Sequence, residues 1–246
     1  MTSPETTFWR VSSLPTHEVT DQQRGEPSPP LAWLPDPLLP CTDLPDPADA
    51  GLAPLDVQTA LKGRRTERDY LDQPITLAEL SYLLWASQGV VEVIEEVGVA
   101  LRTVPSAGAR HAFETFILAN RVADLTPGIY RYSALHHRLA RYDASRDVAA
   151  RMETAFLQQD HISRSAVTFI WSAVVERMAW RYGTRGLRYL LIEAGHIGQN
   201  VYFAGAQLGL GVCTVGGFED DAVNALLGLD GEEQFAVYSA TVGHVE

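Results

Sequence analysis

Residues 185–208 read RGLRYLLIEAGHIGQNVYFAGAQL, the longest largely apolar stretch of the chain. Apolar residues occur on most sides of the helix that this stretch predicts, so the helix should be covered over most of its surface. A helix of this kind belongs in the middle of a large domain or of a dimer. Glu193, His196 and Gln199 interrupt the apolar run, which indicates a helix buried in protein and not a membrane span.

The segments around this helix predict further helices and strands without strict alternation. Thr76, with Glu79 three residues later, forms a capping box that opens a helix expected to end near Gln88. Residues 128–132 and 138–142 alternate between apolar and polar side chains and should form a hairpin. Other strands are expected at 114–119, 166–173, 212–215 and 235–242, and other helices at 55–63, 147–157 and 220–227. The pattern predicts an α+β fold whose sheet is covered by helices.

The N-terminal part of the chain has a different composition. Eleven of the fourteen prolines lie before Leu55. Residues 26–54 are rich in Pro, Asp and Leu and show no helical or strand period, so we expect them to be extended and irregular. We therefore divide the chain into a proline-rich N-terminal arm, residues 1–54, and a folded domain, residues 55–246.

Composition excludes several classes of protein. The net charge is −12, and binding nucleic acid or a membrane surface needs a broad basic face, so we expect neither partner. Cys41 and Cys213 are the two cysteines, and they offer no zinc spacing and no disulfide framework, so we expect no metal site and a reducing cytoplasm. Residues 1–10 lack the basic and apolar regions of a signal peptide.

Against this acidic background, residues 61–70, LKGRRTERDY, concentrate positive charge at Arg64, Arg65 and Arg68. Charge alone leaves two interpretations open, a solvated basic helix end or a site for a small anion. Two further segments favour the anion site. RTVPSAGARH, residues 102–111, and VGGFEDD, residues 215–221, carry small residues that let a ligand approach the backbone closely, and guanidinium groups suit phosphate.

Five segments together resemble the nitroreductase-type FMN flavoproteins. These segments are RRTERDY (64–70), TLAELSYLLWASQG (76–89), RTVPSAGARHAFETF (102–116), RYGTRGLRYLLIEAGHIGQN (181–200) and LGLGVCTVGGF (208–218). The sequence is most similar to the azoline dehydrogenases, which make thiazoles and oxazoles in peptide natural products. The resemblance covers roughly residues 55–243. In the arm, FWRVSSLPTHEVT (8–20) resembles the segment that precedes the core in that branch.

The resemblance implies an intertwined α+β homodimer with a central, mostly antiparallel sheet and two FMN sites at the subunit interface. It implies that the N–H of Gly216 points at flavin N5, and that residues 105–110 line the flavin from the partner subunit. The family's basic residue near the last strand is replaced here by a histidine. The cofactor-binding residues implied are Arg64, Arg65, Thr66, Arg68, Pro105, Ser106, Ala107, Gly108, Arg110, Gly216, Gly217 and His244.

The implied catalytic pair departs from the family pattern. Azoline dehydrogenases typically carry a Lys-Tyr pair where this sequence has Arg181 and Tyr182. An arginine is a poor base because its pKa lies above about 12, so Tyr182 is expected to handle the proton while Arg181 fixes or polarises the substrate.

The resemblance implies an FMN-dependent oxidoreductase that dehydrogenates a thiazoline- or oxazoline-type group on a peptide or carrier-bound intermediate. Two alternatives stay open. One is a stand-alone NAD(P)H-dependent nitro or quinone reductase, and the other is a non-catalytic partner in a peptide-modifying complex. The missing lysine and the histidine at position 244 motivate the second alternative.

Overall fold

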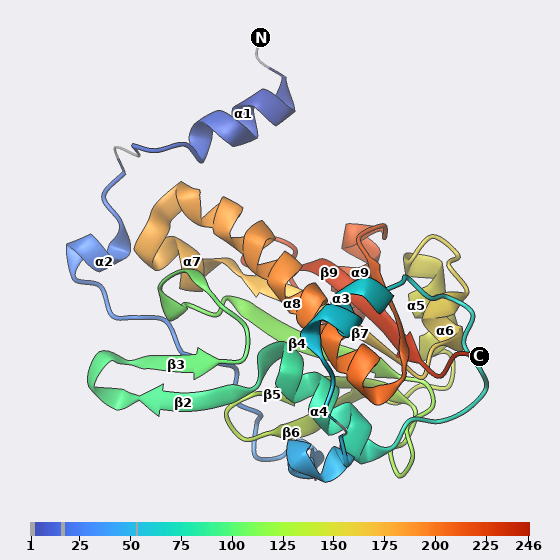
Figure 1. The fold of residues 1–246 in the computed structure, drawn as a ribbon. Coiled ribbons are helices and arrows are strands. Elements are labelled where there is room, and N and C mark those ends of the chain that lie inside the picture. Colours follow the sequence, from blue (N-terminus) through green and yellow to red (C-terminus); the bar gives the residue numbers. More distant parts are fainter. Residues whose placement is uncertain (1–2, 16–17, 53) are drawn as a thin grey trace.

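A seven-stranded sheet forms the centre of the molecule (Figure 1). The structure is a computed structural model that describes residues 3–15, 18–52 and 54–246. The strand order is β1-β6-β5-β4-β7-β9-β8, and each neighbouring pair is antiparallel. The strands are β1 (Cys41–Asp43), β4 (Phe113–Ala119), β5 (Gly128–Ser133), β6 (Arg138–Asp143), β7 (Val167–Val174), β8 (Gly211–Val215) and β9 (Gln234–Gly243).

Helices cover both faces of this sheet. The longer ones are α3 (Val57–Gly63), α4 (Leu77–Gln88), α5 (Val148–Ala155), α7 (Val175–Tyr182), α8 (Gly186–Leu208) and α9 (Asp220–Leu227), with the single turn α6 (His161–Arg164). Ile117 of β4 packs in one core cluster with residues of α4 and α8, whereas Phe116 and Leu118 pack in a second cluster with residues of α5 and α9. The α+β fold with an antiparallel sheet covered by helices is confirmed, and burial on both faces explains why β4 is apolar almost throughout.

The helices predicted from local signals are present. In the capping box of α4, the Thr76 hydroxyl accepts from the Glu79 N–H (3.1 Å), and the Glu79 carboxylate accepts from the Thr76 N–H (2.6 Å). The helix α8 spans most of the predicted stretch, but it is not covered all round. Leu191 and Ile192 are 54% and 53% exposed, so one apolar face of α8 is open in this single copy of the chain.

The N-terminal arm contains more regular structure than its sequence indicates. No strand is predicted in residues 26–54, and this is wrong for β1, in which Thr42 pairs with Leu139 of β6. A strand of three residues is too short to show an alternating pattern, and only its pairing with β6 fixes it. The arm also forms α1 (Pro4–Val11), which projects from the domain, α2 (Asp21–Arg24) and the 3-10 turn η1 (Pro47–Ala50) (Figure 1). The division of the chain near residue 54 stays a prediction.

Two further elements are not predicted from the sequence. One is a separate two-stranded hairpin formed by β2 (Val90–Ile94) and β3 (Val99–Arg102). The other is α7, which follows β7 directly and begins without a side-chain cap. Among the helices that the structure describes, none is long and apolar enough to cross a membrane. In the same described residues, no three His, Cys, Asp or Glu side chains gather in a way that could hold a metal ion.

Candidate active site

The arginine segment, residues 64–68, runs from the end of α3 along the C-terminal part of α8 and the start of β8. The N–H of Glu67 donates to the carbonyl of Val212 (3.0 Å), which fixes the segment to the sheet. The Thr66 hydroxyl lies 3.0 Å from the Tyr202 hydroxyl, and the Arg64 guanidinium lies 5.1 Å from the centre of the Tyr202 ring. Arg64 and Arg65 line a cavity of about 210 Å³ in this region.

The charges of this segment are not neutralised by the protein. In the part of the chain that the structure describes, no carboxylate forms an ion pair with Arg64, Arg65 or Arg68. Arg65 donates to the backbone carbonyls of Lys62 (3.1 Å) and Arg64 (2.8 Å), which carry no net charge. Guanidinium groups without acidic partners beside a cavity fit a phosphate group, because such an anion would supply the missing charge.

The C-terminal end of the chain lies alongside the arginine segment. The carbonyl of His244 accepts a hydrogen bond from the N–H of Leu71 (2.8 Å), which holds the end of β9 beside residues 64–71. Val245 lines the same cavity as Arg64 and Arg65. The structure therefore brings the C-terminal residues next to the arginines, whereas a contact of the His244 imidazole with an anion, which the family resemblance implies, stays a prediction.

A second group of predicted residues converges where the loop 105–110 meets the end of α7. Gly108 has a φ of 59°, and a methyl group built there would lie 2.6 Å from the Tyr182 hydroxyl and 3.1 Å from Cδ of Arg181. A side chain at this position would strain the left-handed backbone and push the ends of the Tyr182 and Arg181 side chains aside. The Tyr182 ring also packs edge-on against Tyr189 of α8, with ring centres 4.8 Å apart.

The other residues of this loop have different neighbours. Arg110 is 4% exposed, and its guanidinium donates to the Arg177 carbonyl (3.1 Å) and to the Ser28 hydroxyl (2.7 Å). It also lies 4.6 Å from the centre of the Trp180 ring. These contacts direct Arg110 toward α7 and the arm. Of the other predicted residues in this loop, Pro105 is exposed, whereas Ser106 and Ala107 are half-buried.

Gly216 and Gly217 follow β8 and are exposed. Gly216 lines an apolar cavity of about 410 Å³, to which α1, α8 and β9 also contribute. The lining side chains are Phe8, Leu187, Leu190, Leu191, Phe218, Asp220, Phe235, Ala236 and Val237. The carbonyl of Gly217 accepts from the Gln159 side chain (2.7 Å). This is a suitable surface for a planar, largely apolar ring beside an exposed backbone amide.

Alanine at position 216 should separate ligand binding from stability. A methyl group on Gly216 would lie no closer than 3.8 Å to Tyr238, so the fold has room for it. We expect Gly216→Ala to change the free energy of unfolding by less than about 0.5 kcal/mol, but to weaken FMN binding at least about tenfold by blocking approach to the amide. Fluorescence titration and chemical denaturation measure the two effects.

Gly243→Ala is the matched control and should show the opposite pattern. A methyl group there would lie 2.9 Å from the Tyr70 ring and 3.1 Å from the backbone nitrogen of Ala166. Crowding of this kind costs about 1–3 kcal/mol of stability. A stability loss in Gly216→Ala as large as in Gly243→Ala would contradict a ligand-contact role for Gly216.

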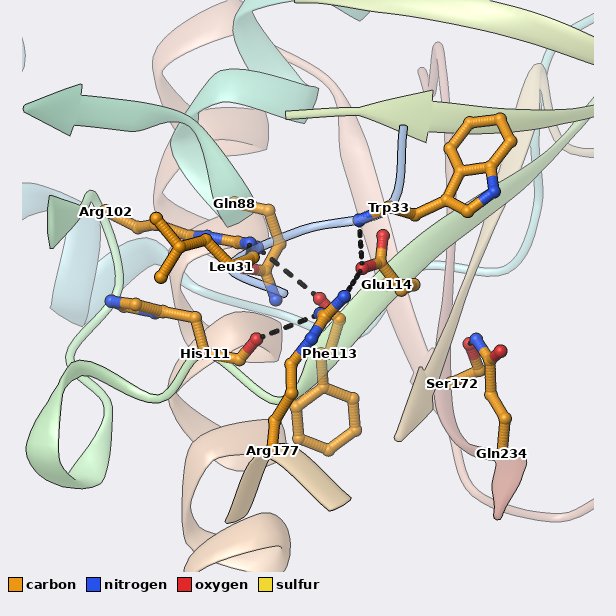
Figure 2. A network of polar contacts seen from close by, with 10 residues as sticks. All are labelled: Leu31, Trp33, Gln88, Arg102, His111, Phe113, Glu114, Ser172, Arg177 and Gln234. Atoms are coloured by element: carbon orange, nitrogen blue, oxygen red, sulfur yellow. Dashed lines mark hydrogen bonds and ion pairs between the residues drawn. The ribbon is translucent and has the colours of Figure 1, made fainter. Parts of the chain in front are cut away.

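A buried network that the sequence does not predict lies next to the loop 105–110 (Figure 2). Its centre is an ion pair between Arg177 of α7 and Glu114 of β4, with 2.5 Å between nitrogen and oxygen and both side chains at most 5% exposed. Arg102 of β3 donates to the Gln88 side chain (2.8 Å). The Arg177 guanidinium also donates to the His111 carbonyl (3.4 Å).

This network fastens the arm to the domain. Arg102 donates to the carbonyl of Leu31 (3.0 Å), and the N–H of Trp33 donates to the Glu114 carboxylate (2.8 Å). Figure 2 shows the arm passing across the network at these two residues. The Arg131 guanidinium lies 4.4 Å from the centre of the Trp33 ring. Arg102 of β3, Glu114 of β4 and Arg131 of β5 thus hold residues of the predicted arm.

Glu193 is the second buried carboxylate that the sequence does not mark as functional. It lies on α8, is 2% exposed, and accepts a hydrogen bond from the Ser106 hydroxyl (2.5 Å). Burial raises the pKa of Glu193 to about 7, against the opposing effects of the Ser106 hydrogen bond and the Arg102 charge. Burial also lowers the pKa of His111 to about 3, with the charge of Arg102 acting in the same direction. The sequence signal that could have revealed Glu193 is a single carboxylate in an otherwise apolar helical run.

Two curated relatives share sequence with this chain. A nitroreductase-type protein of Methanocaldococcus jannaschii is 36% identical over 171 residues, which is 70% of this chain and 83% of that protein. The trifolitoxin-processing protein TfxB of Rhizobium leguminosarum bv. trifolii is 31% identical over 133 residues, which is 52% of this chain. The chain spans 36% of the length of TfxB.

Solved structures share the fold. A nitroreductase-type protein of Anabaena variabilis superposes with a TM-score of 0.69 and 27% identity over 85% of this chain, which spans 42% of that protein's length. A nitroreductase-type protein of Desulfovibrio desulfuricans, solved in complex with FMN, has the same fold with a TM-score of 0.54 and 15% identity, covering 78% of this chain and 87% of that one. The sequence model of the nitroreductase family matches residues 61–244. The chain therefore belongs to the nitroreductase family.

Proposed function

We propose that the chain is an FMN-dependent oxidoreductase that dehydrogenates a thiazoline- or oxazoline-type ring on a peptide or carrier-bound intermediate. Membership of the nitroreductase family supports an oxidoreductase. The observation that carries the proposal is the pair of guanidinium groups, Arg64 and Arg65, that line one cavity and have no acidic partner among the described residues. Sequence shared with the trifolitoxin-processing protein supports a peptide-derived substrate.

The residues present fit FMN in charge and in shape. Arg64, Arg65 and Arg68 would hold the phosphate, and the Thr66 hydroxyl would lie beside the ribityl chain. The apolar cavity next to Gly216 would take the ring system, with the Gly216 amide free to donate. When bound, FMN supplies the acceptor for a hydride from the substrate ring.

The protein's own part in the reaction falls to Tyr182 and Arg181. As hydride leaves the substrate ring, a second ring position loses a proton, and Tyr182 in its deprotonated form would accept it on the phenolate oxygen. The positive charge of Arg181, whose guanidinium lies 5.7 Å from the Tyr182 ring, would stabilise the phenolate before it takes up the proton. Gly108 keeps this part of the site open, because any side chain at that position would displace the Tyr182 hydroxyl.

We also propose that the working form is a homodimer. The open face of α8 exposes Leu191 and Ile192, which would be covered by a second copy. Gly216 and Leu191 line one cavity, whereas Gly108 contacts Tyr182 at the end of α7. A partner copy could bring its own loop 105–110 to the flavin, as the family resemblance implies.

The direct test of function uses the purified chain loaded with FMN. We expect anaerobic addition of a synthetic thiazoline peptide to bleach the flavin absorbance and to yield the thiazole, with dioxygen restoring the colour. Rapid bleaching by NADPH, with no effect of the thiazoline peptide, would favour the stand-alone reductase. A chain that takes up no FMN would leave only the non-catalytic role.

Tyr182→Phe should separate cofactor binding from chemistry. The change removes the oxygen that accepts the proton and keeps the ring that packs on Tyr189, so we expect normal FMN content and turnover lowered about a hundredfold. Tyr189→Phe is the matched control and should keep turnover within about threefold. Undiminished turnover in Tyr182→Phe would remove the proposed role.

A further inference from the structure

We propose that Glu193 is a positioning residue that holds the loop 106–112 against α8 and so sets where Gly108 meets Tyr182 and Arg181. The link to catalysis rests on the proposed function. The holding contact itself is a property of the chain and can be tested without cofactor or substrate.

One carboxylate anchors this loop to α8. The Ser106 hydroxyl donates to Oε2 of Glu193 (2.5 Å). The N–H of His111 donates in turn to the Ser106 hydroxyl oxygen (2.9 Å). In the described part of the chain the second oxygen, Oε1, has no hydrogen-bond partner of its own. A buried side chain of α8 therefore fixes the position of the loop at Ser106.

The loop needs such a contact because its backbone is strained. Gly108, Ala109 and His111 have φ values of 59°, 51° and 44°, in the left-handed region. Glycine adopts this region freely, but each non-glycine residue there costs on the order of 1 kcal/mol. Such a conformation persists only when surrounding contacts impose it. The contact of Glu193 with Ser106, and that of Ser106 with the N–H of His111, bracket Gly108 and Ala109.

Charged groups of three other elements surround Glu193. Arg102 of β3 and Arg177 of α7 act on its carboxyl, and Arg177 is paired with Glu114 of β4. His111 of the loop has a pKa lowered to about 3 and is neutral above pH 5. The pKa of Glu193 is raised to about 7 by burial, so Glu193 changes charge between pH 6 and 8.

The direction of the pH effect follows from linkage. The Glu193 pKa is about 7 in the closed loop and would return toward its ordinary value of 4.5 if opening let water reach the carboxyl. The protonated Glu193 carboxyl therefore stabilises the closed loop fully below pH 4.5. This stabilisation is lost as the pH rises through 7. With these two pKa values, the equilibrium constant for opening rises about tenfold between pH 6 and pH 8.

Amide hydrogen exchange of residues 106–112 in the full chain, without FMN, tests the contact. We compare wild type with Glu193→Gln, a neutral side chain of the same shape, and with Glu193→Ala, which removes the contact. Glu176→Gln, the same change at an exposed position of α7, is the control. For each variant we take the ratio of its amide exchange rate to that of Glu193→Gln at the same pH. This ratio cancels the intrinsic chemical rate of exchange.

We expect the wild-type ratio to rise about tenfold from pH 6 to pH 8, the Glu176→Gln control to follow wild type, and Glu193→Ala to exchange fast at both pH values. A wild-type ratio that does not change with pH, or slow exchange in Glu193→Ala, would overturn the proposal.

The affinity for FMN in the same variants should fall as the exchange of residues 106–112 becomes faster. A chain that binds no FMN but shows the expected exchange would refute the proposed function and leave the positioning role standing.

Discussion

Replacing Glu114 with glutamine should lower the free energy of unfolding by about 3–5 kcal/mol. The change keeps the shape of the side chain but leaves Arg177, 5% exposed in its side chain, without its counter-charge at 2.5 Å. Arg102, which is buried nearby at 9% exposure, also loses a neighbouring negative charge, and burial already lowers its pKa. Urea denaturation of wild type and Glu114→Gln at pH 7.5 measures the difference.

The matched control breaks an ion pair that water surrounds. Asp160→Asn removes the partner of Arg164 at 3.2 Å, where both side chains are more than half exposed. Exposed pairs contribute less than about 1 kcal/mol, so this variant should unfold almost as wild type does. Similar losses in the two variants would show that the network in Figure 2 does not anchor the arm and α7 as described.

Replacing Arg64 and Arg65 together with alanine should lower the affinity for FMN about a thousandfold. A hydrogen bond to a charged group is worth about 1.5–3 kcal/mol, and two such groups would be lost. The fold should persist, because Arg64 is half-buried, Arg65 is exposed, and neither forms an ion pair in the described part of the chain. Fluorescence titration measures the affinity, and circular dichroism measures the fold.

Arg24→Ala combined with Arg146→Ala is the control for net charge. It removes the same two positive charges from other parts of the surface, so general attraction of an anion falls equally. We expect its FMN affinity to stay within about threefold of wild type. An affinity loss in this control equal to that in the Arg64 and Arg65 variant would show that net charge, and not a site, determines binding.

The parts of the fold that depend on local signals could be predicted from the sequence. The capping box at Thr76 and Glu79 forms as expected, because both partners lie within one turn. The helix α7 was missed, since it begins directly after β7 at Val174 with no capping side chain. The strand β1 was missed because its pairing partner in β6 lies about a hundred residues further along the chain.

The candidate site shows the same division between local and distant contacts. Clustered arginines and paired glycines are visible in the sequence, and these led to Arg64, Arg65 and Gly216. The contact between Gly108 and Tyr182 joins residues far apart in the chain, and only the family resemblance placed both in one site. Nothing in the sequence paired Glu193 with Ser106, since both the burial of Glu193 and its partner depend on tertiary packing.

The same reasoning applies to Arg110. The family resemblance implies a flavin contact for this residue. In the structure its Nε donates to the Arg177 carbonyl and its Nη2 to the Ser28 hydroxyl, contacts that a sequence pattern cannot reveal.

Comparing FMN with riboflavin in titrations of the wild-type chain tests the central claim most directly. The two ligands share the ring system and differ in the phosphate, which we assign to the arginine segment. We expect FMN to bind at least about a hundredfold more tightly than riboflavin, and the difference to disappear when Arg64 and Arg65 are alanine. Equal affinity for the two ligands in the wild-type chain would contradict the account.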